Sequence, residues 1–274
     1  MTTHTPFIDL DLARRLEQAE GRGGIGFVEA RMAIDPAHGA TWMERHGAYA
    51  MFDGVGSPIT QTFGFGLFSA PTHGQLDEIE AFFRERGSEV FQEVSPLAAP
   101  EVLTMLPERG YRPIELTSVM HMRLTGDRPA AQRRSSAELT VRRIDPGEEP
   151  VWAETAARGW GDIPGLGELV LDLGRVSAGS RGTVCFLAEW NGAPIGAAAA
   201  ALHGGVAVLA GASTAPEFRG RGAQAALLGA RLAYAASAGC DLAMMGASPG
   251  SASQRNGERQ GFRIGYTRIK WEQR

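Results

Sequence analysis

The stretch TAPEFRGRGAQAALLGARLAYAASAGC, residues 214–240, joins a glycine-rich turn directly to a helical pattern. The turn, RGRGA at residues 219–223, follows a strand-like segment, Val206–Ser213. Glycines let a ligand approach the backbone closely, and the N–H groups at a helix N-terminus attract anions. Two arginines add positive charge. The stretch therefore predicts an anion site suited to a pyrophosphate, made by the turn and the start of the helix.

The spacing of residues in and around this turn excludes two common nucleotide-binding motifs. The turn lacks the GxxxxGK[ST] spacing of a nucleotide P-loop and the GxGxxG spacing of a dinucleotide site. A helix is expected from about Ala223 to Ala238, where Gly239 would end it. A strand, a second short helix and the segment ERQGF (258–262) then lead into a last strand-like tail, Ile264–Trp271.

This order of elements resembles the acetyl-CoA-binding core of the GNAT superfamily of N-acetyltransferases. The family pattern is [Q/R]-x-x-G-x-[G/A] on the loop with a GF turn further on, and Arg219, Gly222 and Gly261-Phe262 match it. Gln224 stands where glycine or alanine is usual, so its side chain either points away from the cofactor or makes an extra contact. The resemblance implies acetyl-CoA as the acyl donor, bound by Ala212, Ser213, Thr214, Arg219, Gly220, Arg221, Gly222, Ala223 and Gln224.

Composition sets outer limits on the function. The chain has 274 residues, enough for two domains with separate cores. Its net charge of −4 offers no basic field, so no nucleic-acid partner is expected. No apolar run approaches membrane-spanning length and no secretory signal is visible, so we expect a cytoplasmic protein without a membrane partner. Cys185 and Cys240 lie in apolar settings and are expected to be buried structural thiols.

The two halves of the chain follow one plan. LPERGYR (106–112) is similar to GERQGFR (257–263), and each precedes a strand-like tail. The polar, arginine-rich segment between the halves is typical of a linker. This weak self-similarity suggests two copies of one module. We therefore expect a first domain at 1–124, a linker at 125–138 and a second domain at 139–274. An unrelated α/β partner domain is the alternative for the first half.

Hydrophobic periodicity supplies the expected elements of the first half. They are helices at Leu10–Ala19, Gln75–Arg86 and Glu101–Glu108, and strands at Gly26–Ile34, Ala48–Phe52, Thr60–Leu67, Val90–Val94 and Ile114–Met122. Where the second half has RGRGA, the first has FSAPTHG (68–74), with one glycine, a proline without an N–H and no arginine. We therefore expect a degenerate module that binds no pyrophosphate.

The resemblance also implies the fold. The class is α/β with a mixed sheet: two GNAT-like modules, each a central, mostly antiparallel sheet flanked by helices. In the second module the sheet is expected to splay at the CoA site. Two such modules in one chain suit a monomer with an internal pseudo-dimer, or a homodimer.

Acylation of an amine requires a neutral amine and donors for the oxyanion, and it benefits from a proton donor for the leaving thiolate. The resemblance implies a tyrosine five residues before the phenylalanine of the GF turn, but Gly257 stands there. Ser253 lies in S-x-x-N-x-E-x-x-G-F, which resembles the serine-bearing helix of ribosomal-protein N-terminal acetyltransferases. Ser253 is therefore the candidate proton donor or sulfur-orienting group, with a helix N-cap or a polar contact as the structural alternative.

A general base is harder to assign. Many relatives carry a glutamate on the strand before the loop, yet Val206–Ser213 has neither carboxylate nor histidine. His203, Glu189 and Asp162 remain as candidates, each with solvated surface as the alternative. Asp162 is favoured, because the resemblance places its loop, GWGDIPG (159–165), on the acceptor side, where a carboxylate would hold an ammonium group.

The absence of a clear base bears on the acceptor. At pH 7 a lysine-type amine, with a pKa of about 10.4, is only about 0.04% neutral, whereas an α-amino group is roughly 10–20% neutral. We therefore expect a small-molecule amine or α-amino acceptor that attacks the thioester directly. The alternatives are a non-catalytic acyl-CoA-binding sensor or scaffold, and a nucleotide-binding regulator, which is disfavoured because no Mg²⁺-ligand pattern accompanies the loop.

Overall fold

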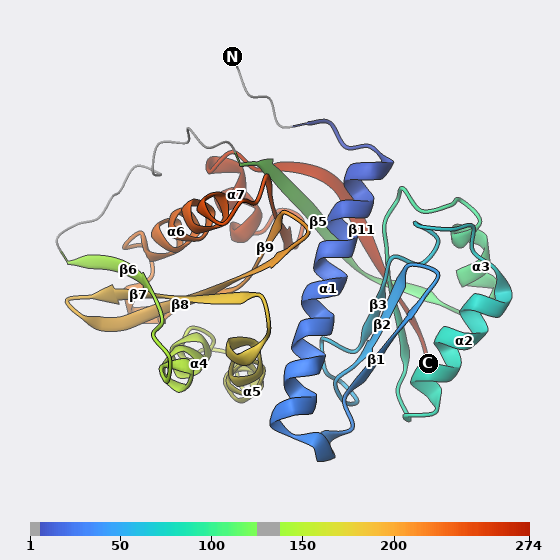
Figure 1. The fold of residues 1–274 in the computed structure, drawn as a ribbon, viewed down its shortest axis with the longest axis horizontal. Coiled ribbons are helices and arrows are strands. Elements are labelled where there is room, and N and C mark those ends of the chain that lie inside the picture. The colour runs from blue at the N-terminus through green and yellow to red at the C-terminus, as the bar shows by residue number, and fades with distance from the viewer. Residues whose placement is uncertain (1–5, 125–137) are drawn as a thin grey trace. The chain divides into compact units, whose positions relative to one another are not determined.

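The computed structural model describes residues 6–124 and 138–274, so the expected linker lies outside the described residues except for its last residue. The chain forms two compact units (Figure 1). The loop unit lies within Met122–Met245 and contains the RGRGA turn, and the split unit combines Thr5–His121 with Gly246–Arg274. Compactness therefore divides the chain differently from the expected modules, because its last 29 residues pack with the first half. The modular boundaries at 1–124 and 139–274 stay a prediction.

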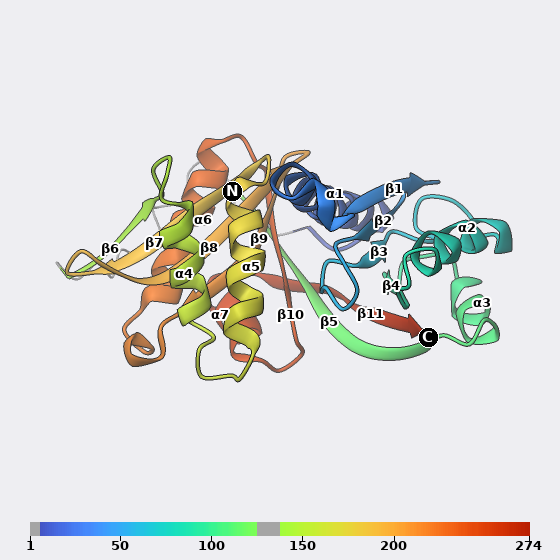
Figure 2. The same cartoon turned by 90° about the horizontal axis from the view of Figure 1, so that it is seen from below.

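In the loop unit the strands pair in the order β10-β9-β8-β7-β6, and helices lie on both faces of these strands (Figures 1 and 2). Neighbouring strands are antiparallel except for β9 and β10, which are parallel. Helices α4 and α5 cover one face and α6 covers the other. The elements are β6 (Leu139–Arg143), α4 (Glu149–Arg158), α5 (Leu166–Gly179), β7 (Thr183–Trp190), β8 (Ala193–His203), β9 (Val206–Thr214), η2 (Pro216–Phe218), α6 (Ala223–Ser237) and β10 (Leu242–Ala247).

Small side chains on β8 explain how helices approach both faces of this sheet. Ala197 and Ala199 pack with Trp152 of α4, whereas Ala198 packs with Leu227 of α6. Successive side chains of a strand point to opposite faces, so an alanine run leaves little thickness on either side. The run thus keeps both helical layers close to the strand that pairs with β9.

The split unit also places helices on both faces of a mostly antiparallel sheet. Its strand order is β1-β2-β3-β4-β11-β5, with only β3 and β4 parallel. The elements are α1 (Leu10–Ile34), η1 (Pro36–His38), β1 (Thr41–Arg45), β2 (Ala48–Phe52), β3 (Gln61–Phe63), α2 (His73–Arg84), β4 (Val90–Val94), α3 (Val102–Glu108), β5 (Arg112–Arg123), α7 (Ala252–Arg259) and β11 (Arg263–Gln273). The expected α/β class with antiparallel sheets flanked by helices is confirmed.

The strand expected at Gly26–Ile34 is wrong, because α1 continues through it to Ile34. Two glycines that precede this segment in α1 serve close packing. A Cβ on Gly21 would lie 2.6 Å from the ring of Tyr49, and a Cβ on Gly24 would lie 2.4 Å from the sulfur of Met51. Glycine therefore lets the helix lie against β2. The strand expected at Thr60–Leu67 is also shorter, since β3 ends at Phe63.

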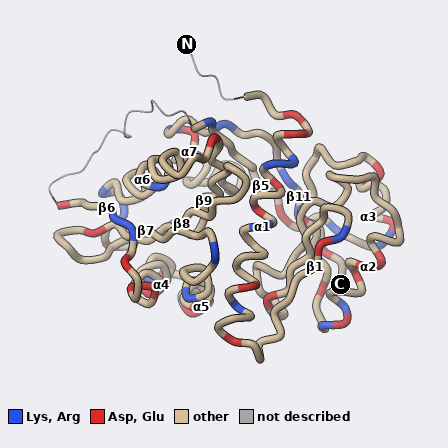
Figure 3. The backbone as a smooth tube through the Cα atoms, viewed as in Figure 1, with Lys and Arg blue, Asp and Glu red and all other residues tan. Residues whose placement is uncertain are grey.

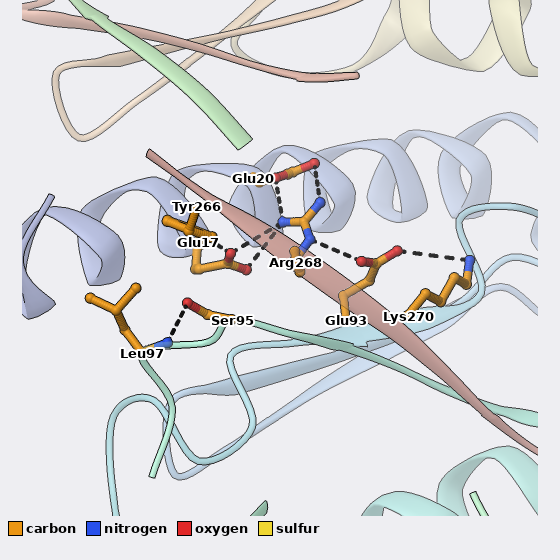
Figure 4. A network of polar contacts seen from close by, with 8 residues as sticks. All are labelled: Glu17, Glu20, Glu93, Ser95, Leu97, Tyr266, Arg268 and Lys270. Carbon is orange, nitrogen blue, oxygen red and sulfur yellow. Dashed lines mark hydrogen bonds and ion pairs between the residues drawn. The ribbon is translucent and has the colours of Figure 1, made fainter. Parts of the chain in front are cut away.

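Strand β11 is fixed in the split unit by a buried charge cluster (Figure 4). The guanidinium of Arg268 contacts three carboxylates: Glu17 at 3.2 Å and Glu20 at 2.7 Å, both on α1, and Glu93 of β4 at 2.9 Å. The hydroxyl of Tyr266 donates to Glu17 at 2.7 Å. Burial raises the pKa of Glu17 to about 7, although Arg268 opposes the shift. These contacts connect the C-terminal strand with α1 and β4.

Charge is otherwise spread over the described chain. Figure 3 shows acidic and basic residues interspersed along both units. Both cysteines are free and buried. None of the described helices combines the length and apolarity that crossing a membrane requires.

Candidate functional site

Strand β9 leaves its parallel neighbour within the loop unit. The register joins only Val206–Val208 to Leu242–Met244, and β9 continues to Thr214. On the other side a bulge places Gly211 and Ala212 opposite a single residue of β8, and Gly211 has a φ of +62°. A bulge sharpens the twist of its strand. Within the described residues, 209–214 therefore has backbone groups without a strand partner on the β10 side, as the expected splay requires.

The turn that follows β9 presents an open helix N-terminus. Gly220 and Gly222 have φ values of +80° and +88°, which glycine adopts without strain. Gly222 is the N-cap of α6, and no side chain caps this helix. The N–H groups of a first helical turn lack intrahelical acceptors, and they form the positive end of the helix dipole. A Cβ on Gly220 would meet nothing within 4 Å. The backbone thus fits a phosphate-bearing ligand.

Arg219, the first residue of the turn, binds the loop between α4 and α5. Its guanidinium donates to both carboxylate oxygens of Asp162, at 2.7 and 3.1 Å. A third hydrogen bond runs to the carbonyl oxygen of Gly159 at 2.8 Å. Both charged side chains are about half exposed, at 48% and 47%. The hydrogen bonds from Arg219 lower the pKa of Asp162. The structure thus brings two predicted site residues together as an ion pair.

The other long side chains of the turn also have partners in the protein. The guanidinium of Arg221 lies 4.9 Å from the ring centre of Trp190 and 5.3 Å from that of Phe218. Such cation–π contacts keep the charge near the turn and leave the guanidinium donors for other acceptors. The amide of Gln224 donates to Thr214 Oγ1 at 3.1 Å. Gln224 thus joins the start of α6 to the end of β9.

Close packing holds the end of β9 against α4. The hydroxyl of Ser213 donates to the carbonyl oxygen of Ala156 at 2.9 Å. A Cβ on Gly159 would lie 2.4 Å from that of Ser213, and one on Gly196 would lie 2.9 Å from the Ser213 carbonyl oxygen. Sequence reasoning missed the packing role of these two glycines. Gly159 stands in the predicted acceptor loop, but its partner comes from a distant strand.

The predicted acid and base candidates belong to different units. Glu189 forms an ion pair with Arg142 of β6 at 2.9 Å, and His203 ends β8 beside Gly182. Ser253 is an exposed residue near the start of α7 in the split unit. The N-cap there is Ser251, whose hydroxyl accepts from the Gln254 N–H. Ser253 is therefore not the cap, and its catalytic role stays a prediction.

Comparisons with known proteins agree with this arrangement. Residues 158–262, which include the turn and the GF segment, match the sequence profile of the acetyltransferase (GNAT) family. No match is found among the curated proteins.

Solved structures share the fold over most of the chain. A GCN5-related N-acetyltransferase from Kribbella flavida is 18% identical with a TM-score of 0.67, and the match covers 95% of each chain. A GCN5-related N-acetyltransferase from Sphaerobacter thermophilus is 17% identical, with a TM-score of 0.58 over 85% of this chain and 75% of that one. A tandem GNAT protein from the clavulanic acid biosynthesis pathway is 14% identical, with a TM-score of 0.56 over 82% of this chain and 74% of that one.

The family profile covers the part of the chain that holds the turn. Residues 158–262 match the acetyltransferase (GNAT) family, and this match supports an acyltransferase. The expected resemblance to this family is confirmed, and one of the structural neighbours is a tandem GNAT protein. The degenerate state of the first half stays a prediction.

Proposed function

We propose that the chain is an acetyl-CoA-dependent N-acetyltransferase that works in its second half. The observation that carries this proposal is that a strand end without a neighbour on the β10 side leads into a helix without a side-chain cap. Residues 209–214 of β9 offer backbone groups beyond the last pair with β10, and α6 starts without a side-chain cap. Together they suit an extended amide-bearing arm that ends in a pyrophosphate.

Two sets of groups would hold the donor. The N–H groups at the start of α6 would hold the pyrophosphate, with Arg221 as the nearby charge. The main chain of Ala212–Thr214 would pair with the pantetheine arm. Acetyl-CoA supplies an acetyl thioester, which an amine attacks directly.

The acceptor is an amine with a low pKa. Glu189 is paired with Arg142 and Asp162 with Arg219, so neither carboxylate is free to take a proton before acetyl-CoA binds. An α-amino group or a comparable small-molecule amine is already partly neutral at pH 7. Trp160 and Ile163, both partly exposed beside Asp162, offer it an apolar surface.

Two measurements test the proposal. Calorimetry with acetyl-CoA should show one site per chain, and a thiol-release assay at pH 7 should show faster turnover with α-amino compounds than with lysine peptides. Absence of acetyl-CoA binding would refute the proposal. Binding without thiol release across the amine panel would instead indicate a non-catalytic acyl-CoA module. Two sites per chain would refute the expectation that the first half binds no acetyl-CoA.

A prediction for Ser253 belongs to the same assay. Ser253→Ala should lower kcat with little change in the KM for acetyl-CoA, because the hydroxyl would assist the leaving thiolate without holding the cofactor. Ser251→Ala, which removes the N-cap of α7, is the control for damage to the helix. Unchanged turnover in Ser253→Ala would exclude this residue from the mechanism.

A further inference from the structure

The ion pair between Arg219 and Asp162 joins two loops that serve different substrates. Arg219 opens the turn that would receive the pyrophosphate, and Asp162 lies in the loop expected on the acceptor side. Each charge is already occupied by the other. A pyrophosphate and the carboxylate of Asp162 are competing acceptors for one guanidinium, since both accept bidentate hydrogen bonds in its plane.

The exposure of this pair makes it exchangeable. Both side chains are about half exposed, and ion pairs of this kind contribute little and are screened by salt. A pyrophosphate brings more negative charge than one carboxylate and would also meet the open N-terminus of α6. The carboxylate is therefore the weaker of the two partners.

The third hydrogen bond allows exchange without loss of the arginine's anchor. Arg219 Nη2 also donates to the carbonyl oxygen of Gly159, in the last turn region of α4. A guanidinium carries five N–H donors, so this bond can persist when Asp162 leaves. Arg219 then stays beside α4, while the N–H groups that donated to Asp162 donate to the pyrophosphate instead.

We propose that Asp162 occupies Arg219 until the pyrophosphate of acetyl-CoA displaces it, and that the freed carboxylate then accepts hydrogen bonds from the acceptor's amino group. Asp162 is thus a positioning residue for the acceptor and a competitor of the cofactor. The inference rests on the proposed function. Asp162 becomes available to the acceptor only after the cofactor has displaced it from Arg219.

The sign of one mutational effect tests the exchange. Asp162→Asn removes the competing charge with almost no change in shape, so CoA should bind about two- to fivefold more tightly by calorimetry in low salt. The gain should shrink as salt increases. Glu217→Gln is the matched control. It also removes one negative charge near Arg219, but Glu217 acts on Arg219 only through space. It should change CoA affinity less than Asp162→Asn.

Steady-state kinetics supply the second readout. Asp162→Asn should raise the KM for the α-amino acceptor while kcat/KM for acetyl-CoA does not fall. Equal or weaker CoA binding by Asp162→Asn, with an unchanged melting temperature, would overturn the exchange and leave the proposed function intact. Failure of the unmodified protein to bind CoA would overturn both.

Discussion

Helices α2 and α6 begin at equivalent places in the two halves, and their N-termini differ in one respect that matters. Each helix follows a strand with a parallel neighbour, β3 beside β4 and β9 beside β10. At α2, Thr72 accepts from the Gln75 N–H at 3.2 Å and Gln75 accepts from the Thr72 N–H at 3.1 Å. At α6, Gly222 supplies no side chain. The capping box satisfies the Gln75 N–H in the first turn of α2, whereas no side chain caps the start of α6.

The segments that precede these helices also differ in their contacts. In the split unit, Phe65 and Leu67 are buried, and the Leu67 carbonyl accepts from Arg14 at 3.0 Å. The Gly66 carbonyl accepts from the Ala99 N–H at 2.8 Å. In the loop unit, residues 219–222 are exposed. Residues 69, 70 and 72–74, in the counterpart of that turn, are exposed as well. The two helix starts therefore differ in capping and in arginine content, and this difference supports the proposal that only the second half binds acetyl-CoA.

The strongest test of this contrast is a methyl group at the open turn. Gly222→Ala forces a non-glycine residue into a φ of +88°, at a cost of roughly 1–2 kcal/mol. If the turn relaxes to avoid this strain, affinity for acetyl-CoA should fall about five- to thirtyfold by calorimetry.

Gly74→Ala is the matched control for that variant. Gly74 lies in the first turn of α2 without a positive φ, and an added Cβ meets nothing within 4 Å. Alanine should leave acetyl-CoA binding unchanged and raise helix stability slightly. Equal losses of affinity in both variants would contradict the difference between the two helix starts.

A second variant tests the closed helix start directly. Thr72→Ala removes the capping box, so the free energy of unfolding should fall by about 1 kcal/mol in chemical denaturation. The stoichiometry of acetyl-CoA should stay at one per chain, because the buried apolar residues before α2 remain. A second bound acetyl-CoA in this variant would show that the cap alone silences the first half.

The sequence predicted the local parts of this comparison well. The strands Ala48–Phe52 and Val90–Val94 were placed at their observed bounds, and the start of α6 at Ala223 was correct. In each case the evidence is local: alternating apolar residues, or a glycine turn before a helical pattern. The absence of arginine at 68–74 likewise pointed to a different helix start in the first half.

Features that depend on distant contacts escaped the sequence. Arg219 was assigned to the cofactor and Asp162 to the acceptor, because nothing local indicates that residues 57 positions apart form an ion pair. The continuation of α1 beyond Ala19 was missed, because Tyr49 and Met51, which pack against Gly21 and Gly24, come later in the chain. The Arg268 cluster had one local signal: Glu17 shares a helix face with the buried Ala13 and Gly21.

The Arg268 cluster gives the smallest expected effect, which is a change in how the melting temperature depends on pH. This effect concerns the split unit and leaves the loop unit unchanged. The pKa of Glu17 is raised from 4.5 to about 7, so the native state binds its proton more tightly than the unfolded chain. The stability from this group is therefore fully present below about pH 4.5 and is lost as the pH rises through about 7. Glu17→Gln mimics the protonated form and should flatten the fall in melting temperature between pH 5 and about 7.5.

The matched control for pH is an exposed glutamate of the same unit. Glu44 pairs with Arg22 at 3.2 Å with about two fifths of each side chain exposed, so Glu44→Gln should leave the pH profile of the melting temperature almost unchanged. Acetyl-CoA affinity should show no corresponding change in Glu17→Gln, because the open turn belongs to the loop unit. A pH profile for Glu17→Gln that parallels the unmodified protein would mean that the proton resides elsewhere in the cluster, with Glu93 next, since burial raises its pKa as well.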